Sequence, residues 1–272
     1  MKLPHRRQCL HLAACAAFAL MTGPSAAQTL DKVKQRGVLV VGTKADYKPF
    51  GFRDTTGAIA GFEPDLARDV AQRLGARLEL EPVVSSNRMQ FLQQGKIDLM
   101  LATMNVTQER RQTVGIIDPS YYASGVNVLA IKKAALKTWE QLKSQKICAI
   151  QGAWYNKIVA EKYGAEIVAF RGQTESETAL LQGNCVGWMY DDTAFLERLG
   201  DPKWSAFEMP LETILHEPWG AAVKLEERNG PWGQFMANTI TEWHRSGKLI
   251  EVEKKWSIPP SAFLTKMRAE TK

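Results

Sequence analysis

The stretch Ile97-Asp-Leu-Met-Leu-Ala-Thr-Met-Asn-Val-Thr-Gln-Glu-Arg-Arg111 joins an apolar run of strand length to a polar turn. In that turn, Thr107 is a typical N-cap for a short helix that carries Arg110 in its first turn. Because a planar guanidinium matches a carboxylate or phosphate, Arg110 beside the hydroxyl of Thr103 and the amide of Asn105 predicts a carboxylate clamp. The alternative is a strand-to-helix junction with a solvated arginine.

Strand and helix patterns alternate on both sides of this stretch. A helix is predicted at 61–74, where Leu66, Val70 and Leu74 recur every fourth residue and form one apolar face. The alternation restarts near residue 132, as if a second unit began. Such alternation predicts an α/β fold with mainly parallel sheets. The other predicted strands lie at 38–41, 78–83, 147–150, 167–170 and 186–190, and the other helices at 89–94, 155–162, 176–182 and 232–246. The second unit closes at the apolar run 220–223.

Residues 1–27 have the pattern of a secretory signal peptide. A basic head precedes an apolar run, and three small residues end at Ala27. The segment around Cys15 resembles a lipoprotein box but lies inside the apolar run. We therefore expect cleavage after Ala27, and a free periplasmic protein rather than a lipid-anchored one.

Without this segment the chain is close to neutral. The sequence has 35 basic and 29 acidic residues, and three of the basic ones lie in 1–27, which leaves 32 against 29 and a net charge near +3. No run of Lys or Arg alternates with aromatic residues, so nucleic acid is not an expected partner. No later apolar stretch has the length of a membrane span.

Two cysteines, Cys148 and Cys185, remain after the signal peptide, and each lies on an apolar, strand-like run, at 146–150 and 185–190. In a secreted chain, two such cysteines predict a disulfide between neighbouring strands. A catalytic thiol would need a nearby histidine, and neither His216 nor His244 lies in a recognisable nucleophile setting. The same wide spacing argues against a zinc site, so no metal or cofactor is expected.

The order of motifs resembles family 3 of the bacterial periplasmic solute-binding proteins, the amino-acid receptors of ABC importers. The matching pieces cover nearly all of the chain after the signal peptide. This resemblance implies two α/β lobes with mainly parallel sheets, joined by two crossover strands (type II), and a ligand in the cleft between them. We assign 28–130 and 222–272 to lobe I and 131–221 to lobe II. The pieces include the turn 42–50 with its aromatic-x-Pro-Phe ending, Gly61-Phe-Glu-Pro-Asp-Leu66, 102–110, Asp118-Pro-Ser-Tyr-Tyr122 and Tyr190-Asp-Asp192.

The resemblance also implies how the ligand backbone is held. Arg110 would grip the α-carboxylate, while Thr103 and Asp191 would receive the α-ammonium. Relatives often have threonine where this chain has Asn105, whose amide still donates. A buried zwitterion needs both kinds of partner, because unpaired buried charge is costly. The alternative for Asp191 is a helix N-cap, a role that we assign to Asp192.

Two further positions complete the pocket that the resemblance implies. Tyr47 would place its ring over the aliphatic part of the ligand. Gly152 would open a helix whose free amides meet a carboxylate. This chain has Ala153 and Trp154 where relatives have hydroxyl residues, so Trp154 would instead form a wall of the pocket.

The side-chain end of the ligand is expected to meet cations. Receptors for glutamate and aspartate have arginines at the positions that Lys44 and Arg88 hold in this chain. Ser85, three residues before Arg88, is expected in the same part of the pocket. Gln173 stands where some of these receptors have histidine. In a water-poor cleft such cations favour a second carboxylate. Asn-Arg pairs also occur in members of other specificity, so other polar amino acids remain open.

The sequence therefore predicts a non-enzymatic, monomeric binding component of an amino-acid importer. Its partners would be a free amino acid and the membrane permease subunits of an ABC transporter. One alternative is a periplasmic lyase of the same fold, such as a cyclohexadienyl dehydratase, but no Glu or His is clearly placed as a general acid. The other is a ligand-sensing module, which would need a membrane span and an output domain.

Overall fold

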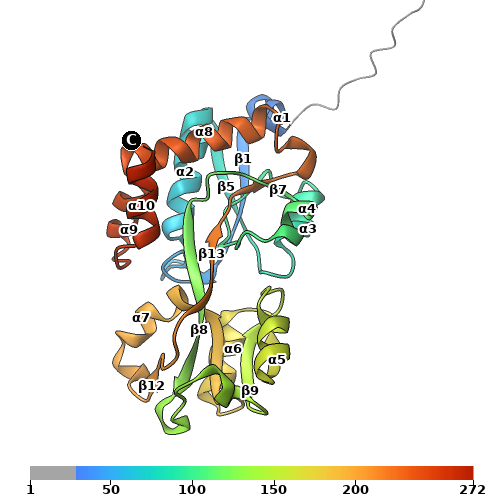
Figure 1. The fold of residues 1–272 in the computed structure, drawn as a ribbon. Coiled ribbons are helices and arrows are strands. Elements are labelled where there is room, and N and C mark those ends of the chain that lie inside the picture. The colour runs from blue at the N-terminus through green and yellow to red at the C-terminus, as the bar shows by residue number, and fades with distance from the viewer. Residues whose placement is uncertain (1–28, 272) are drawn as a thin grey trace, which may run out of the picture.

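The computed structural model describes residues 29–271, which form two lobes, each built around its own sheet (Figure 1). The predicted signal peptide and Cys15 lie outside these residues. The predicted fold class is confirmed: helices cover both sheets, and two long strands connect the lobes. The division at residues 130/131 and 221/222 stays a prediction.

Lobe I, the upper lobe in Figure 1, contains a five-stranded sheet in the order β5-β1-β6-β14-β7. The strand β1 pairs in parallel with β5 and β6, whereas β14 runs antiparallel to β6 and β7. The strands are β1 (Val38–Thr43), β5 (Arg77–Pro82), β6 (Leu99–Met100), β7 (Gly115–Ile116) and β14 (Ala222–Val223), with a small sheet of β2 (Asp46–Tyr47), β3 (Gly51–Arg53) and β4 (Ile59–Ala60). The helices are α1 (Thr29–Arg36), α2 (Phe62–Leu74), α3 (Arg88–Gln93), α4 (Gln108–Thr113), α8 (Pro231–Ser246), α9 (Lys248–Lys255) and α10 (Ala262–Glu270).

Lobe II, the lower lobe, contains the second sheet, in the order β10-β9-β11-β8-β12, with β13 also paired to β8. The pairs of β9 with β10 and β11 are parallel, and the pairs made by β8 are antiparallel, so the sheet is mixed. The strands are β8 (Tyr122–Ile131), β9 (Lys146–Ile150), β10 (Glu166–Phe170), β11 (Gly187–Asp191), β12 (Phe207–Glu208) and β13 (Ile214–Trp219), and the helices are α5 (Asn156–Tyr163), α6 (Gln173–Leu181) and α7 (Leu196–Leu199).

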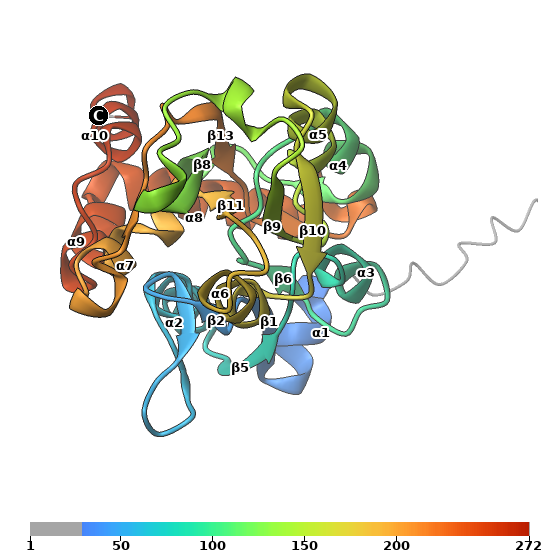
Figure 2. The ribbon, with the colours of Figure 1, turned by 90° about the horizontal axis from the view of Figure 1, so that it is seen from below.

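The strands β8 and β13 are the two crossovers between the lobes. They pair with each other from Tyr122 and Trp219 to Val126 and Ile214. At the lobe I end, the ring of Trp219 lies 4.8 Å from that of Phe50. Seen from below in Figure 2, α6 of lobe II covers β2 of lobe I, so the two lobes are in contact.

Local sequence signals explain the elements around the focal stretch. The hydroxyl of Thr107 accepts the N–H of Arg110 at 3.2 Å, so the predicted cap of α4 is confirmed. The helix α2 buries Leu66 and Val70 and ends at Gly75, whose left-handed backbone suits glycine. The predicted strand before Thr103 is shorter than expected, since β6 contains two residues.

Cys148 and Cys185 form the predicted disulfide, with their Cα atoms 5.6 Å apart. Cys148 lies in β9, and Cys185 lies two residues before β11, the parallel neighbour of β9. The bond therefore connects adjacent segments of one sheet. No helix among residues 29–271 is long and apolar enough to cross a membrane.

Candidate functional site

Most of the predicted ligand-binding residues meet between the two lobes, where the carboxyl ends of the parallel strands point. Ligands of open α/β sheets bind at such strand ends. Lys44 follows β1, Thr103 lies three residues after the end of β6, and Asp191 ends β11. The buried members are Lys44, Tyr47, Ser85, Arg88, Thr103, Asn105 and Arg110 from lobe I, and Gln173 and Asp191 from lobe II. Gly152 is exposed at the edge of the group.

Arg110 connects the two lobes. Its guanidinium donates to the carbonyl oxygen of Asn105 at 2.9 Å and to that of Gly152, in lobe II, at 3.0 Å. Burial, together with the charge of Arg88, lowers the pKa of Arg110 to about 9. A lowered pKa means that neighbouring anions do not fully offset the burial of the guanidinium. An anion bound beside Arg110 would therefore be favoured.

Asp191 faces two tyrosines. The hydroxyl of Tyr155 donates to its carboxylate at 3.2 Å, and that of Tyr47 lies 3.4 Å from the other oxygen. Burial, and then the charge of Asp192, raises the pKa of Asp191 to about 7. Asp191 holds the N-cap position of the helical turn Asp192–Ala194, but its side chain makes no capping hydrogen bond. The assignment of the cap to Asp192 was wrong, because Asp192 is the first residue of that turn and its carboxylate accepts the N–H of Gly125 at 3.2 Å. The carboxylate of Asp191 is positioned to receive a cation.

Lys44 and Arg88 are both buried, although a lysine is usually solvated. The ammonium of Lys44 donates to the hydroxyl of Ser85 at 3.3 Å and lies 3.8 Å from Asp46. Burial lowers the pKa of Lys44 and also that of Arg88. Together with Arg110, they place three buried cations in the interlobe region, beside the carboxylates of Asp46, Glu63 and Asp191.

Thr103 has a left-handed backbone with φ of 46°, which is strained for a β-branched residue and typically costs about 1–3 kcal/mol. Its hydroxyl oxygen is buried and has no hydrogen-bond partner among residues 29–271. The same is true of both amide atoms of Gln173. Since buried polar groups normally have partners, these atoms indicate where a polar ligand would be held.

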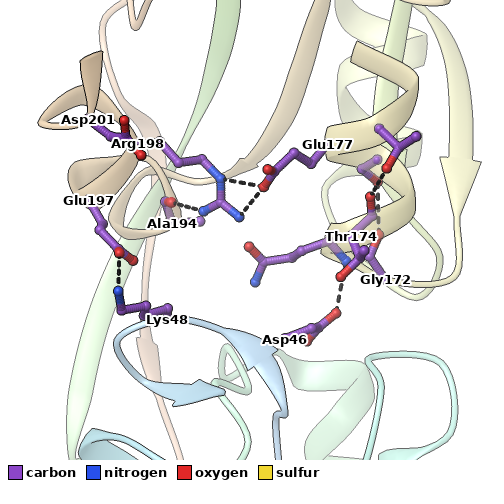
Figure 3. Close-up of polar contacts among 12 residues, drawn as sticks. Asp46, Lys48, Gly172, Thr174, Glu177, Ala194, Glu197, Arg198 and Asp201 are labelled. Carbon is purple, nitrogen blue, oxygen red and sulfur yellow. Dashed lines mark hydrogen bonds and ion pairs between the residues drawn. The ribbon is translucent and has the colours of Figure 1, made fainter. Parts of the chain in front are cut away.

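Further polar contacts join the lobes beside this group (Figure 3). The carboxylate of Asp46 accepts the backbone N–H of Gln173 at 2.8 Å, at the first turn of α6. Lys48 pairs with Glu197 across the same gap. On the lobe II side, Arg198 donates to Glu177 at 2.9 Å and fixes α7 against α6. The structure therefore shows the lobes closed on each other.

Two predicted residues are placed differently from expectation. The helix α5 begins at Asn156, not near Gly152, so the free amides expected at Gly152 are not those of a helix start. Gly152 instead presents its carbonyl to Arg110. The side-chain amide of Asn105 donates to Ser124 on β8 at 3.4 Å, so it contacts a crossover strand.

The sequence reasoning missed four residues of the site: Glu63, Tyr121, Tyr155 and Thr193. Glu63 is fully buried and accepts the N–H of Thr103 at 2.6 Å, and burial raises its pKa to about 7. Tyr121 donates to Glu63, and Thr193 lies 2.7 Å from the hydroxyl of Tyr47. The sequence carried no signal for Glu63, because a glutamate in the first turn of an amphipathic helix is normally solvated.

Two lobes joined by two crossover strands, with a charged group buried between them, define the class of two-lobed solute-binding proteins. The family model described as "Bacterial extracellular solute-binding proteins, family 3" matches residues 39–259. The chain belongs to this family, as the motif order indicated.

Relatives and solved structures agree with this assignment. A glutamine-binding protein of an ABC transporter from Bacillus subtilis (strain 168) is 29% identical over 234 residues, covering 84% of each chain. A glutamate/aspartate import solute-binding protein from Salmonella typhimurium is 26% identical over 266 residues, covering 92% of this chain and 87% of the relative. A mutant of ArgBP from T. maritima superposes with a TM-score of 0.77 at 28% identity, covering 84% of this chain and 99% of that one.

Proposed function

We propose that the protein is the periplasmic substrate-binding component of an ABC importer and that it holds one polar α-amino acid between its lobes. The burial of a cation from lobe I, Arg110, and an anion from lobe II, Asp191, between the lobes carries this proposal. An α-carboxylate at Arg110 and an α-ammonium at Asp191 would each meet the opposite charge out of water. A single zwitterion would then hold both lobes closed, which is the state in which membrane permease subunits would receive it.

The cluster of three buried cations supports an acidic side chain, glutamate or aspartate. Lys44, Arg88 and Arg110 are buried, and burial lowers the pKa of each. The carboxylates near them are Asp46, which lies 3.8 Å from Lys44, and the buried Glu63 and Asp191, whose pKa values are both raised to about 7. With the α-carboxylate at Arg110, a second ligand carboxylate near Lys44 would offset the remaining charge. One relative is named for glutamate and aspartate import, and another for glutamine.

Thermal melting against a panel of amino acids tests this function. A ligand that binds only the folded protein raises the Tm in proportion to RT ln(1 + [L]/Kd). L-glutamate or L-aspartate should give the largest shift, with L-glutamine, L-arginine and L-cystine as comparisons. A larger shift with L-glutamine would replace the acidic assignment with an amide ligand. A flat panel would contradict the proposed function.

A lyase activity is not proposed. One similar structure is an ancestral amino acid-binding protein described as a precursor of cyclohexadienyl dehydratase, with a TM-score of 0.73 at 28% identity. The raised pKa of Asp191 would suit a general acid, but Asp191 also satisfies the need for an ammonium partner. Product formation from prephenate-like compounds would contradict the binding assignment.

A further inference from the structure

One peptide group in lobe I is held from both sides by opposite charges. This group joins Ala102 to Thr103, immediately before the residue expected to face the ligand ammonium. Its N–H donates to Oε1 of Glu63 at 2.6 Å, and its carbonyl oxygen accepts a guanidinium N–H of Arg88. The orientation of the peptide plane is therefore fixed by a carboxylate at one end and a guanidinium at the other.

The Glu63 side of this arrangement is built for that contact. Glu63 lies in the first turn of α2 with no exposed surface, and its side chain reaches across to the end of β6. Its Oε1 also accepts the hydroxyl of Tyr121, so one oxygen receives two donors. Its other oxygen is buried and has no hydrogen-bond partner in the described chain. Burying a carboxylate with one oxygen unpaired is energetically costly. The burial of Glu63 therefore indicates a specific role for its side chain.

The backbone that Glu63 holds is the strained one. Thr103 has φ of 46°, which few β-branched residues adopt. Such strain persists when the surroundings over-determine it, and it concentrates at ligand-binding positions. All four residues of the arrangement belong to lobe I, so it does not depend on closure of the lobes.

We infer that Glu63 is a positioning residue: its carboxylate, opposite Arg88, fixes the Ala102–Thr103 peptide and so aims Thr103 at the bound amino acid. Glu63 acts through Thr103. The inference rests on the proposed function for the role of Thr103, whereas the peptide clamp itself stands on lobe I alone. Arg88 would consequently donate both to the carbonyl of Ala102 and to the ligand.

The test uses Glu63→Leu and Glu63→Gln, with Glu227→Leu as the matched control. Glu227 is also a buried glutamate, and its Oε1 accepts the backbone N–H of Thr29 at 2.6 Å, far from the site. Glutamine keeps an oxygen that can accept the N–H of Thr103 and the hydroxyl of Tyr121. Glu63→Gln should therefore keep the hydrogen bonds that Glu63→Leu loses. If Glu63 only supported the fold, Glu63→Leu and Glu227→Leu should have the same effect on Thr103 and on ligand binding.

The first readout needs no ligand. Amide hydrogen exchange of ¹⁵N-labelled, ligand-free protein should show Thr103 protected in the wild type, in Glu63→Gln and in Glu227→Leu. In Glu63→Leu, exchange at Thr103 should be at least about tenfold faster, since the buried N–H loses its acceptor. Equal exchange in Glu63→Leu, or an unprotected Thr103 amide in the wild type, would overturn the clamp. If Glu63→Leu does not fold, the exchange rate of the Thr103 amide in the wild type still tests whether the clamp exists.

The second readout is the Kd for L-glutamate. It should rise at least about tenfold in Glu63→Leu and stay within about threefold in Glu63→Gln and Glu227→Leu. Faster exchange at Thr103 with an unchanged Kd would overturn the positioning role. A wild type that binds no amino acid contradicts the proposed function, and the exchange data still decide the clamp.

Discussion

The guanidinium of Arg110 and the carbonyl oxygen of Gly152 lie 3.0 Å apart and join the two lobes directly. Arg110 comes from α4 in lobe I, and Gly152 follows β9 in lobe II. A carbon atom added at Gly152 would lie 2.9 Å from the backbone of Ser85, so the lobes approach as closely as a glycine permits. The same guanidinium that is proposed to bind the ligand carboxylate therefore also contacts lobe II in the closed state.

Asp191 should make the ligand-free protein sensitive to pH. Burial raises its pKa from 3.8 to about 7 in the closed arrangement, where Tyr47, Tyr155, Lys44 and Arg88 surround it. An acid whose pKa is raised by folding contributes stability that is complete below the unfolded value and is lost as the pH rises through the folded value. The Tm of the ligand-free wild type, measured against Asp191→Asn, should therefore fall between about pH 4 and about pH 7 and level off at higher pH. A constant Tm difference over that range would contradict this assignment.

Gly172→Ala should hinder closure. A Cβ at Gly172 would lie 2.6 Å from the Asp46 carboxylate that accepts the N–H of Gln173 (Figure 3). Overpacking of this kind costs about 1–3 kcal/mol, which would weaken the closed state and appear as weaker binding of L-glutamate. Gly200→Ala, at an exposed position with room for a methyl group, is the control. Small-angle scattering should show Gly172→Ala staying extended at ligand concentrations that compact the control. Equal compaction of the two variants would reject this role for Gly172.

The disulfide should stabilise lobe II without contributing to recognition. It closes a loop with a sequence separation of 37, and such bonds typically contribute about 2–4 kcal/mol. Urea unfolding of the Cys148→Ala/Cys185→Ala double variant should show a loss of this size, with the Kd for L-glutamate nearly unchanged. Thiol titration of the denatured, unreduced protein should find no free thiol. Two titratable thiols would show that the bond is absent.

Lys44→Met should change specificity. If the ammonium of Lys44 faces a ligand carboxylate, its loss should cost roughly 1.5–3 kcal/mol for L-glutamate and about 1 kcal/mol for L-glutamine. Arg88 is a less clean target, because it also holds the carbonyl of Ala102. Lys34→Met, exposed on α1, controls for the loss of a positive charge. Calorimetry giving the wild-type ratio of affinities for Lys44→Met would place Lys44 outside side-chain recognition.

The sequence predicted those parts of the fold that depend on local patterns. The cap at Thr107, the apolar face of α2 and the alternation of strands and helices each depend on residues close together in the chain. The motif order added the two lobes and most of the cleft residues. The closed contact of Asp46 with Gln173 could not be predicted, because 127 positions separate the two residues.

The site residues that were missed have ordinary sequence surroundings. Glu63 lies in a helix where a solvated glutamate is the usual expectation, and only its burial beneath Thr103 reveals its role. Tyr155 resembles any core aromatic until Asp191 is placed beside it. Gly152 offers its carbonyl to Arg110 and does not open a helix, since α5 starts at Asn156.

Titration of L-glutamate into Arg110→Ala tests the central claim most directly. The protein should first be unfolded and refolded without reduction, so that any amino acid acquired during expression is removed. Truncating one partner of a desolvated charge pair costs about 2–5 kcal/mol, so Arg110→Ala should bind L-glutamate at least about thirtyfold more weakly than wild type. Arg111→Ala, which removes the neighbouring arginine that pairs with Asp118 at the surface, should keep the wild-type Kd. Wild-type affinity in Arg110→Ala, or no binding of any amino acid by the wild type, would contradict the account.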